Sequence, residues 1–331
     1  MAGRLTSVLA LSAALVATGP AAGAYLPPPS GADGSEAGAA AAVWRGVRYG
    51  NRGREPGARR DEMQLMDVYA PSNYPSGVKG AVLFLHGGLW ARGSRNYYRF
   101  QTREVFLARG YVFCTPEFIL QSFPADPPHQ GATFAEILKD VDLAAAGLSR
   151  FLGMFGIRTD RFIIAGESSG GHIALLYAYD AANPTVLGLG LRHSVPFDTV
   201  VDFAGPADLL TMDGGKPSSE MSPEDPRMIA RIVVKRLCGL SDDATDEELI
   251  QLAAKWSPVN LVCRESPMTI MAYGKLAFLL PTDGLVPYSQ MKRLKSKLSA
   301  CGARFKSNTL MYTRHDMVAA DAADWVCDIL R

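Results

Sequence analysis

The sequence lacks a surplus of charge of either sign. Its 331 residues include 34 Lys and Arg against 33 Asp and Glu, which leaves a formal net charge of +1. Nucleic-acid binding generally needs a strongly basic surface, so we expect no nucleic-acid partner. The chain also lacks an apolar run long enough for a stable membrane span. A small-molecule substrate fits these absences better than a polyanion or a bilayer.

Cysteine is scarce and irregularly spaced. The five cysteines include no Cys-x-x-Cys pair and no Cys/His cluster, so we predict no metal site. Five is an odd number, which leaves at least one thiol unpaired in a monomer. Cys114 lies in a short apolar run and is expected to be buried. The spacing leaves open how Cys238, Cys263, Cys301 and Cys327 pair, and also the oligomeric state.

The amino terminus has the features of a secretory leader. Arg4 precedes the apolar run Leu5–Val16, and Ala22-Gly23-Ala24 supplies the small-x-small pattern of a signal-peptidase site. We therefore expect residues 1–24 to be cleaved near Ala24, which would make the mature protein secreted or periplasmic. An uncleaved amphipathic leader is the alternative. Residues 25–42, rich in Pro, Gly and Ala, are predicted to be a linker.

Residues 43–331 are predicted to form one α/β domain. Apolar runs suited to buried strands lie at Ala81–Leu85, Tyr111–Thr115, Phe162–Ala165, Thr199–Phe203 and Met268–Tyr273. Helical patterns, such as Phe134–Gly153 and His172–Ala182, lie between them. This alternation predicts a mostly parallel sheet with helices on both faces.

One segment, residues 206–257, interrupts the alternation. It has no strand pattern, whereas Pro226–Leu237 reads as a helix and Thr245–Glu248 is a capping box that opens a second helix. We predict a small helical cap inserted over the sheet. An ordinary pair of connecting helices is the alternative.

The pattern Gly166-Glu167-Ser168-Ser169-Gly170 lies between a candidate strand and a candidate helix. A nucleophilic Ser needs this context, because it must stand on a sharp strand-to-helix turn. Gly166 and Gly170 flank Ser168 because side chains there would collide in so tight a turn. Ser168 is therefore the predicted nucleophile.

A second glycine pattern, His86-Gly87-Gly88-Leu89-Trp90, follows the apolar run that ends at Leu85. Exposed backbone N–H groups in such a loop can approach a substrate oxygen closely. We predict an oxyanion hole made by the N–H groups of Gly88, Leu89 and Ser169. His86 and Gly87 are expected to support the loop, and Trp90 to line the pocket.

Together, the two patterns resemble those of hormone-sensitive-lipase-type carboxylesterases and the related feruloyl and acetyl-xylan (BD-FAE-like) esterases. The likeness runs from Asp67-Val-Tyr-Ala-Pro71 to the carboxyl terminus. It implies the α/β-hydrolase fold with an eight-stranded sheet and a Ser-Asp-His triad. It also implies a serine carboxylic-ester hydrolase that forms an acyl-enzyme on small or carbohydrate-linked esters, without a cofactor.

The resemblance implies that Asp283, at the start of Asp-Gly-Leu-Val-Pro, is the acid of the triad. The chain departs from the family here, because Lys275–Thr282 separate Gly274 from Asp283 where the family has only a few residues. Asp202 and Asp208 are the alternative acids.

His315 is the predicted base, because it is the only His after Asp283 and precedes the last helical pattern. The chain order Ser168, Asp283, His315 is the one that this fold uses. A second departure lies in the segment Glu117-Phe-Ile-Leu120, where family members often carry Tyr-Arg-Leu.

Other functions remain open at this point. An amidase, formamidase or peptidase of the same fold would use the same residues. A ligand-binding protein with an inactive triad, or a scaffold with a structural Ser168, is the non-enzymatic alternative. The fold alone does not identify the substrate.

The leader generates the first testable prediction. Export should remove residues 1–24, so the mature chain should begin near Tyr25. Mass spectrometry of the intact exported protein measures this directly, and a product that retains Met1–Ala24 would contradict it.

Overall fold

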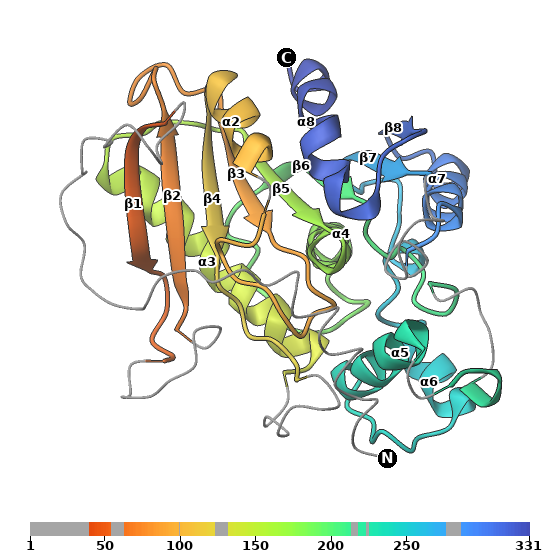
Figure 1. The fold of residues 1–331 in the computed structure, drawn as a ribbon. Helices are drawn as coiled ribbons and strands as arrows, with labels where there is room; N and C mark the ends of the chain where they lie inside the picture. The colour runs from red at the N-terminus through yellow and green to blue at the C-terminus, as the bar shows by residue number, and fades with distance from the viewer. Residues whose placement is uncertain are drawn as a thin grey trace, which may run out of the picture.

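The computed structural model describes residues 40–53, 63–98, 100–122, 132–212, 218–222, 225–275 and 286–331. The predicted leader, most of the predicted linker and Asp283 lie outside these residues. Within them, the predicted α/β-hydrolase architecture is confirmed (Figure 1).

Eight strands form one mostly parallel sheet. They are β1 (Ala40–Arg48), β2 (Leu65–Pro71), β3 (Gly80–Leu85), β4 (Tyr111–Pro116), β5 (Phe162–Glu167), β6 (Phe197–Phe203), β7 (Met268–Gly274) and β8 (Phe305–Leu310). Their order in the sheet is β1-β2-β4-β3-β5-β6-β7-β8. The pairs β1–β2 and β2–β4 are antiparallel, and all other neighbours are parallel. Every residue of β3 and β4 is buried, as expected for strands that are covered on both faces.

Helices cover both faces of the sheet (Figure 1). They are α2 (Phe100–Ala108), α3 (Phe134–Met154), α4 (Ser169–Ala182), α5 (Pro226–Leu237), α6 (Asp246–Ala253), α7 (Ser289–Cys301) and α8 (Val318–Ile329), with 3-10 turns at Ser218–Glu220, Pro258–Asn260 and His315–Met317. Helices α2 and α8 pack together on one face, whereas α3 and α4 pack together on the other. Within the described ranges, no helix is long and apolar enough to cross a membrane.

Local sequence explains where several helices begin. Thr133 and Glu136 form a reciprocal capping box at α3, and Thr245 and Glu248 form the predicted one at α6. Helix α5 begins with Asp225 as its N-cap and a proline at its first turn, which suits both residue types.

Strand β1 begins inside the predicted linker. Ala40 pairs with Pro71 and Ala42 with Ala70, so the last three linker residues belong to the sheet. The run of alanines gives no strand pattern of its own. Pairing with β2 satisfies its backbone, and the following Val43 and Trp44 are buried.

The predicted cap region contains α5 and α6 and, among its described residues, no strand. The two helices lie together beyond the carboxyl ends of the parallel strands (Figure 1). Their role as a cap over the site remains a prediction.

All five cysteines fall within the described residues and are free thiols, including the buried Cys114.

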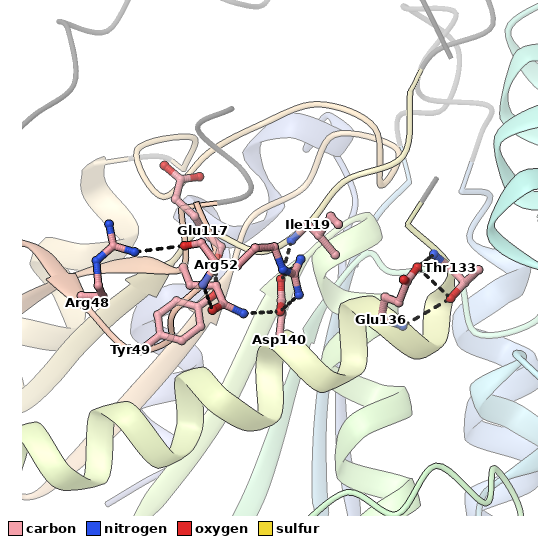
Figure 2. A network of polar contacts seen from close by, with 9 residues as sticks. Arg48, Tyr49, Arg52, Glu117, Ile119, Thr133, Glu136 and Asp140 are labelled. Atoms are coloured by element: carbon pink, nitrogen blue, oxygen red, sulfur yellow. Dashed lines mark hydrogen bonds and ion pairs between the residues drawn. The ribbon is translucent and has the colours of Figure 1, made fainter. Parts of the chain in front are cut away.

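A buried carboxylate ties the amino-terminal part of the sheet to α3. Asp140 accepts hydrogen bonds from the Arg52 guanidinium at 2.6 and 3.1 Å, from Gln64 Nε2 at 2.8 Å and from the Ile119 N–H at 3.0 Å (Figure 2). Burial raises the pKa of the Asp140 carboxyl, and the Arg52 charge opposes that rise. Three segments that are distant in sequence therefore depend on one charged group.

Replacing Arg52 with Ala should lower the free energy of unfolding by roughly 2–4 kcal/mol, because Asp140 would stay buried without its cation. The pKa of Asp140 would rise further, so the loss should grow as the pH rises from about 4 towards neutrality. Denaturant titrations at several pH values measure both effects.

Arg109→Ala is the matched control, because that guanidinium binds Asp324 and Asp328 at the surface. Exposed pairs contribute little to stability. Equal losses of unfolding free energy for the two variants would show that the Arg52–Asp140 pair contributes no more to stability than an exposed pair.

Candidate active site

Ser168 lies on the turn between β5 and α4. Its φ of 55° and ψ of −123° are strained for a residue with a side chain. The Ser168 N–H donates to the Phe203 carbonyl at 2.8 Å, which fixes the turn against β6. A Cβ at Gly166 would collide with the backbone of Gly170, and a Cβ at Gly170 would collide with the Leu85 carbonyl. The glycine spacing in the sequence is therefore a steric requirement.

His315 meets Ser168 across the sheet. Its Nε2 lies 2.9 Å from Ser168 Oγ, although the two residues are 147 positions apart in sequence. His315 begins the 3-10 turn between β8 and α8. A half-buried imidazole at hydrogen-bond distance can accept the serine proton, so this pair has the geometry of a nucleophile and its base.

The predicted acid, Asp283, lies outside the described residues, in the segment 276–285 that joins β7 to α7. Strands β7 and β8 are neighbours in the sheet. Loops that follow parallel neighbours emerge at the same edge, so this connection leaves the sheet on the side from which His315 approaches. Asp283 remains the predicted acid.

Asp202, one alternative acid, is occupied elsewhere. Its buried carboxyl contacts the Gly205 N–H at 2.7 Å and the Tyr273 hydroxyl at 2.7 Å, and not His315. The same hydroxyl also reaches the Gly205 carbonyl. One hydroxyl hydrogen cannot serve two acceptors, so both contacts are satisfied when Asp202 holds a proton. Burial raises the pKa of Asp202 to about 7, which agrees with that arrangement.

Asp208, the other alternative, stabilises a turn. Its carboxylate accepts from the Leu210 N–H at 3.1 Å and from the Thr211 hydroxyl at 2.9 Å. Arg293 lies 3.5 Å away. The structure therefore brings Ser168 and His315 together and assigns both alternative acids to other contacts.

The loop after β3 passes directly against the nucleophile. A Cβ at Gly87 would lie 3.2 Å from Ser168 Cβ, so any side chain there would crowd the site. Gly88, Leu89 and Trp90 have φ values of 122°, 56° and 56°, which is strained for the last two. Among the described residues, none accepts a hydrogen bond from the Gly88 or Leu89 N–H groups. These donors remain available to a substrate oxygen.

Ser169 is the first residue of α4, and its N–H belongs to the unpaired first turn of that helix. The partial positive charge of a helix amino terminus adds to this donor. Ser169 follows Ser168 directly, and Gly88 and Leu89 follow Gly87, which lies against Ser168. The role of these three N–H groups as an oxyanion hole remains a prediction.

His86 supports the loop through two contacts of its ring. Its ring stacks on Phe118 with centroids 4.3 Å apart and an interplanar angle of 15°. Its Nδ1 donates to the Gly87 carbonyl at 2.8 Å. Both contacts fix the start of the loop, which is the supporting position expected for this residue.

Trp90 differs from the expectation that it lines the pocket. Its side chain is only 1% exposed, and its Nε1 donates to His172 Nδ1 at 3.2 Å. His172 in turn donates from Nε2 to the Trp256 carbonyl at 2.8 Å. These bonds fix the His172 tautomer, and burial lowers its pKa to about 3, so the ring stays neutral. Trp90 therefore anchors the loop to α4 and to the segment after α6.

Comparison with known proteins assigns the chain to a family. Residues 66–298, which make up most of the chain, match the BD-FAE family. The chain belongs to the BD-FAE family.

This BD-FAE protein is similar to Esterase LipC of Mycobacterium tuberculosis (strain ATCC 25618 / H37Rv). The two are 25% identical over 246 residues, which cover 72% of this chain and 53% of LipC. The chain thus spans about half the length of that relative.

Solved structures share the fold of this BD-FAE protein. A truncated form of carbohydrate esterase from gut microbiota superposes with a TM-score of 0.65 at 18% identity, over 88% of this chain and 96% of that one. Esterase B from Lactobacillus rhamnosis gives a TM-score of 0.62 at 17% identity, over 93% and 81% of the two chains. At these identities the likeness shows the fold alone.

Among the described residues of the BD-FAE protein, no group of three His, Cys, Asp or Glu side chains could hold a metal ion.

The third prediction separates the candidate acids. Asp283→Asn should lower kcat by about three to four orders of magnitude, because an amide does not hold the His315 tautomer as a carboxylate does. Asp202→Asn should keep a kcat near that of the parent, because its amide can donate to the Tyr273 oxygen as the protonated acid does. If steady-state kinetics instead showed that Asp202→Asn loses kcat while Asp283→Asn keeps it, the acid would be Asp202 in β6.

The Asp202→Asn variant should also differ from the parent in the pH dependence of its unfolding free energy. The folded pKa of about 7 lies above the ordinary value of 3.8, so the contribution of Asp202 is complete below about pH 4 and is lost as the pH rises through 7. An asparagine does not titrate. Unfolding free energies should therefore shift in favour of the variant between pH 4 and 7.

Proposed function

We propose that this BD-FAE protein is a serine carboxylesterase that acts through an acyl-enzyme. The observation that supports it most directly is the 2.9 Å contact between Ser168 Oγ and His315 Nε2. A scaffold or an inactive ligand-binding relative would not need a strained serine paired with an imidazole. Membership of the BD-FAE family and the similarity to Esterase LipC point to the same chemistry.

In the proposed reaction, Ser168 attacks the ester carbonyl while its proton passes to His315 Nε2. Asp283 would hold the other side of the imidazole and stabilise its charged form. The N–H groups of Gly88, Leu89 and Ser169 would bind the negative oxygen of the tetrahedral intermediate. The loss of one such donor typically costs about 100- to 1000-fold in rate.

The imidazolium then returns its proton to the leaving alcohol, and the ester bond breaks to give the acyl-enzyme. Water, deprotonated by His315, attacks the acyl carbon and releases the acid and free Ser168. Every proton passes through one nitrogen atom, so the cycle needs no cofactor of its own.

We propose small or short-acyl esters, including esters linked to carbohydrate, as the substrates. A structure that shares the fold carries the name of a carbohydrate esterase. A panel of p-nitrophenyl, feruloyl and acetyl-xylan esters, compared with anilide and formamide substrates, would identify the class. Faster turnover of the amides would replace the esterase proposal with an amidase.

The fourth prediction concerns the nucleophile. Ser168→Ala should abolish labelling by a fluorophosphonate probe and lower ester turnover by about 10⁶-fold, to the residual rate that binding and the oxyanion hole provide. The variant should still fold, because Ser168 lies on a turn and the removal of its hydroxyl leaves the core intact. Mass spectrometry of the labelled peptide and circular dichroism measure the two outcomes.

Ser299→Ala, on the exposed face of α7, is the control and should label like the parent. Labelling of Ser168→Ala at the parent rate would overturn the assignment of the nucleophile.

A further inference from the structure

Arg95 lies in the loop that carries the oxyanion donors, five residues after Trp90. Its Nε donates to Asp67 Oδ1 at 2.8 Å, and a second guanidinium nitrogen donates to Glu117 Oε1 at 2.8 Å. Its backbone N–H donates to Glu117 Oε2 at 3.1 Å. The guanidinium is 14% exposed, and the two carboxylates are almost completely buried. One buried cation therefore joins the loop to two acids that lie on different segments.

The two acids lie in or directly beside strands of the sheet. Asp67 is in β2, and it also accepts from the Gly46 N–H in β1 at 2.7 Å. Glu117 directly follows β4, and its carbonyl accepts from the Tyr49 hydroxyl. Figure 2 shows that the neighbouring Ile119 is held by Asp140 of α3. Arg95 thus connects the loop to two segments that are themselves held by contacts with Gly46, Tyr49 and Asp140.

The same segment contacts the loop at two more places. Phe118 stacks on His86, and the Gln121 N–H donates to the Trp90 carbonyl at 2.8 Å. Gly88 and Leu89 lie between these two contacts in the chain. The positive φ values of Leu89 and Trp90 are costly to maintain, and they persist only when surrounding contacts hold them.

We propose that Arg95 is a positioning residue, which with Asp67 and Glu117 clamps the oxyanion loop so that the Gly88 and Leu89 N–H groups keep their place beside Ser168. The inference rests on the proposed esterase function. A planar guanidinium suits this task, because it binds two carboxylates in different directions at fixed angles, whereas an ammonium acts as a point charge.

The test compares binding of substrate with stabilisation of the oxyanion. Arg95→Gln should lower kcat by about 10- to 100-fold, because displaced donors stabilise the tetrahedral oxygen less well. KM should change by less than about threefold, since the ground-state ester depends little on these donors. A trifluoromethyl ketone, which Ser168 converts to a tetrahedral oxyanion adduct, should lose affinity by the same factor as kcat. Arg95→Lys should restore part of both losses.

His193→Gln is the matched control for the loss of a buried polar contact with a carboxylate. His193 Nε2 lies 2.9 Å from Asp180 Oδ2, and the exposed fractions of the two side chains are 13% and 1%. Asp180 is twelve residues from Ser168, about 18 Å along α4 at 1.5 Å per residue. This variant should lose thermal stability while the folded protein keeps the parent affinity for the ketone.

Arg95→Gln removes this cation from the buried Glu117 carboxylate and leaves Asp67 with Arg45, 3.9 Å away, so the variant could unfold for that reason alone. The double variant Arg95→Gln/Glu117→Gln removes that charge imbalance and should regain thermal stability without regaining kcat. A folded double variant with the parent kcat and ketone affinity would overturn the clamp. A parent protein that neither reacts with fluorophosphonate nor hydrolyses esters would instead overturn the proposed function, and the clamp with it.

Discussion

The strained turn at Ser168 is the constraint on which the rest of the site depends. The chain can bend so sharply only because Gly166 and Gly170 carry no side chains, and Gly170 then lies against the carbonyl of Leu85 at the end of β3. Strands β3 and β5 are neighbours in the sheet, so the loops that follow them emerge together. The close packing of two backbones therefore sets the distance between the nucleophile and the oxyanion loop.

Three histidines near this turn show how environment assigns different roles to one residue type. His315 is half-buried and its Nε2 contacts the reactive hydroxyl. His172 is fully buried, with both ring nitrogens occupied and its pKa lowered to about 3, so it serves as a neutral link. His86 stacks flat on an aromatic ring and holds the loop. Only the first has the exposure and the partner that proton transfer needs.

Local patterns predicted much of the fold and the sharp turn that carries Ser168. Buried parallel strands are continuous apolar runs, so β3, β4 and β7 were visible in the sequence to within about a residue, and the elbow glycines identified Ser168. Strand β1 was missed because its alanines have no strand pattern, and its partner β2 is what makes it a strand. Strand β8 gives a weaker apolar signal, because it lies at the edge of the sheet and its residues are mostly half-buried.

The long-range polar contacts could not be predicted in this way. The clamp of Arg95 joins positions 67, 95 and 117, which share no motif and meet only through the order of the strands. Asp202 was one of the alternative acids, and only the contact with Tyr273 shows that its carboxyl is occupied. Trp90 was placed in the pocket because aromatic residues often line such sites, whereas its indole N–H finds its acceptor on α4.

The reactive pair joins the best protected part of the sheet to one of the least protected. Ser168 follows β5, a buried central strand, whereas His315 follows β8, which ends the strand order and whose residues are mostly half-buried. Edge segments open locally at a lower free energy than the core. Local opening at this edge would separate His315 from Ser168 while the centre of the sheet stays folded.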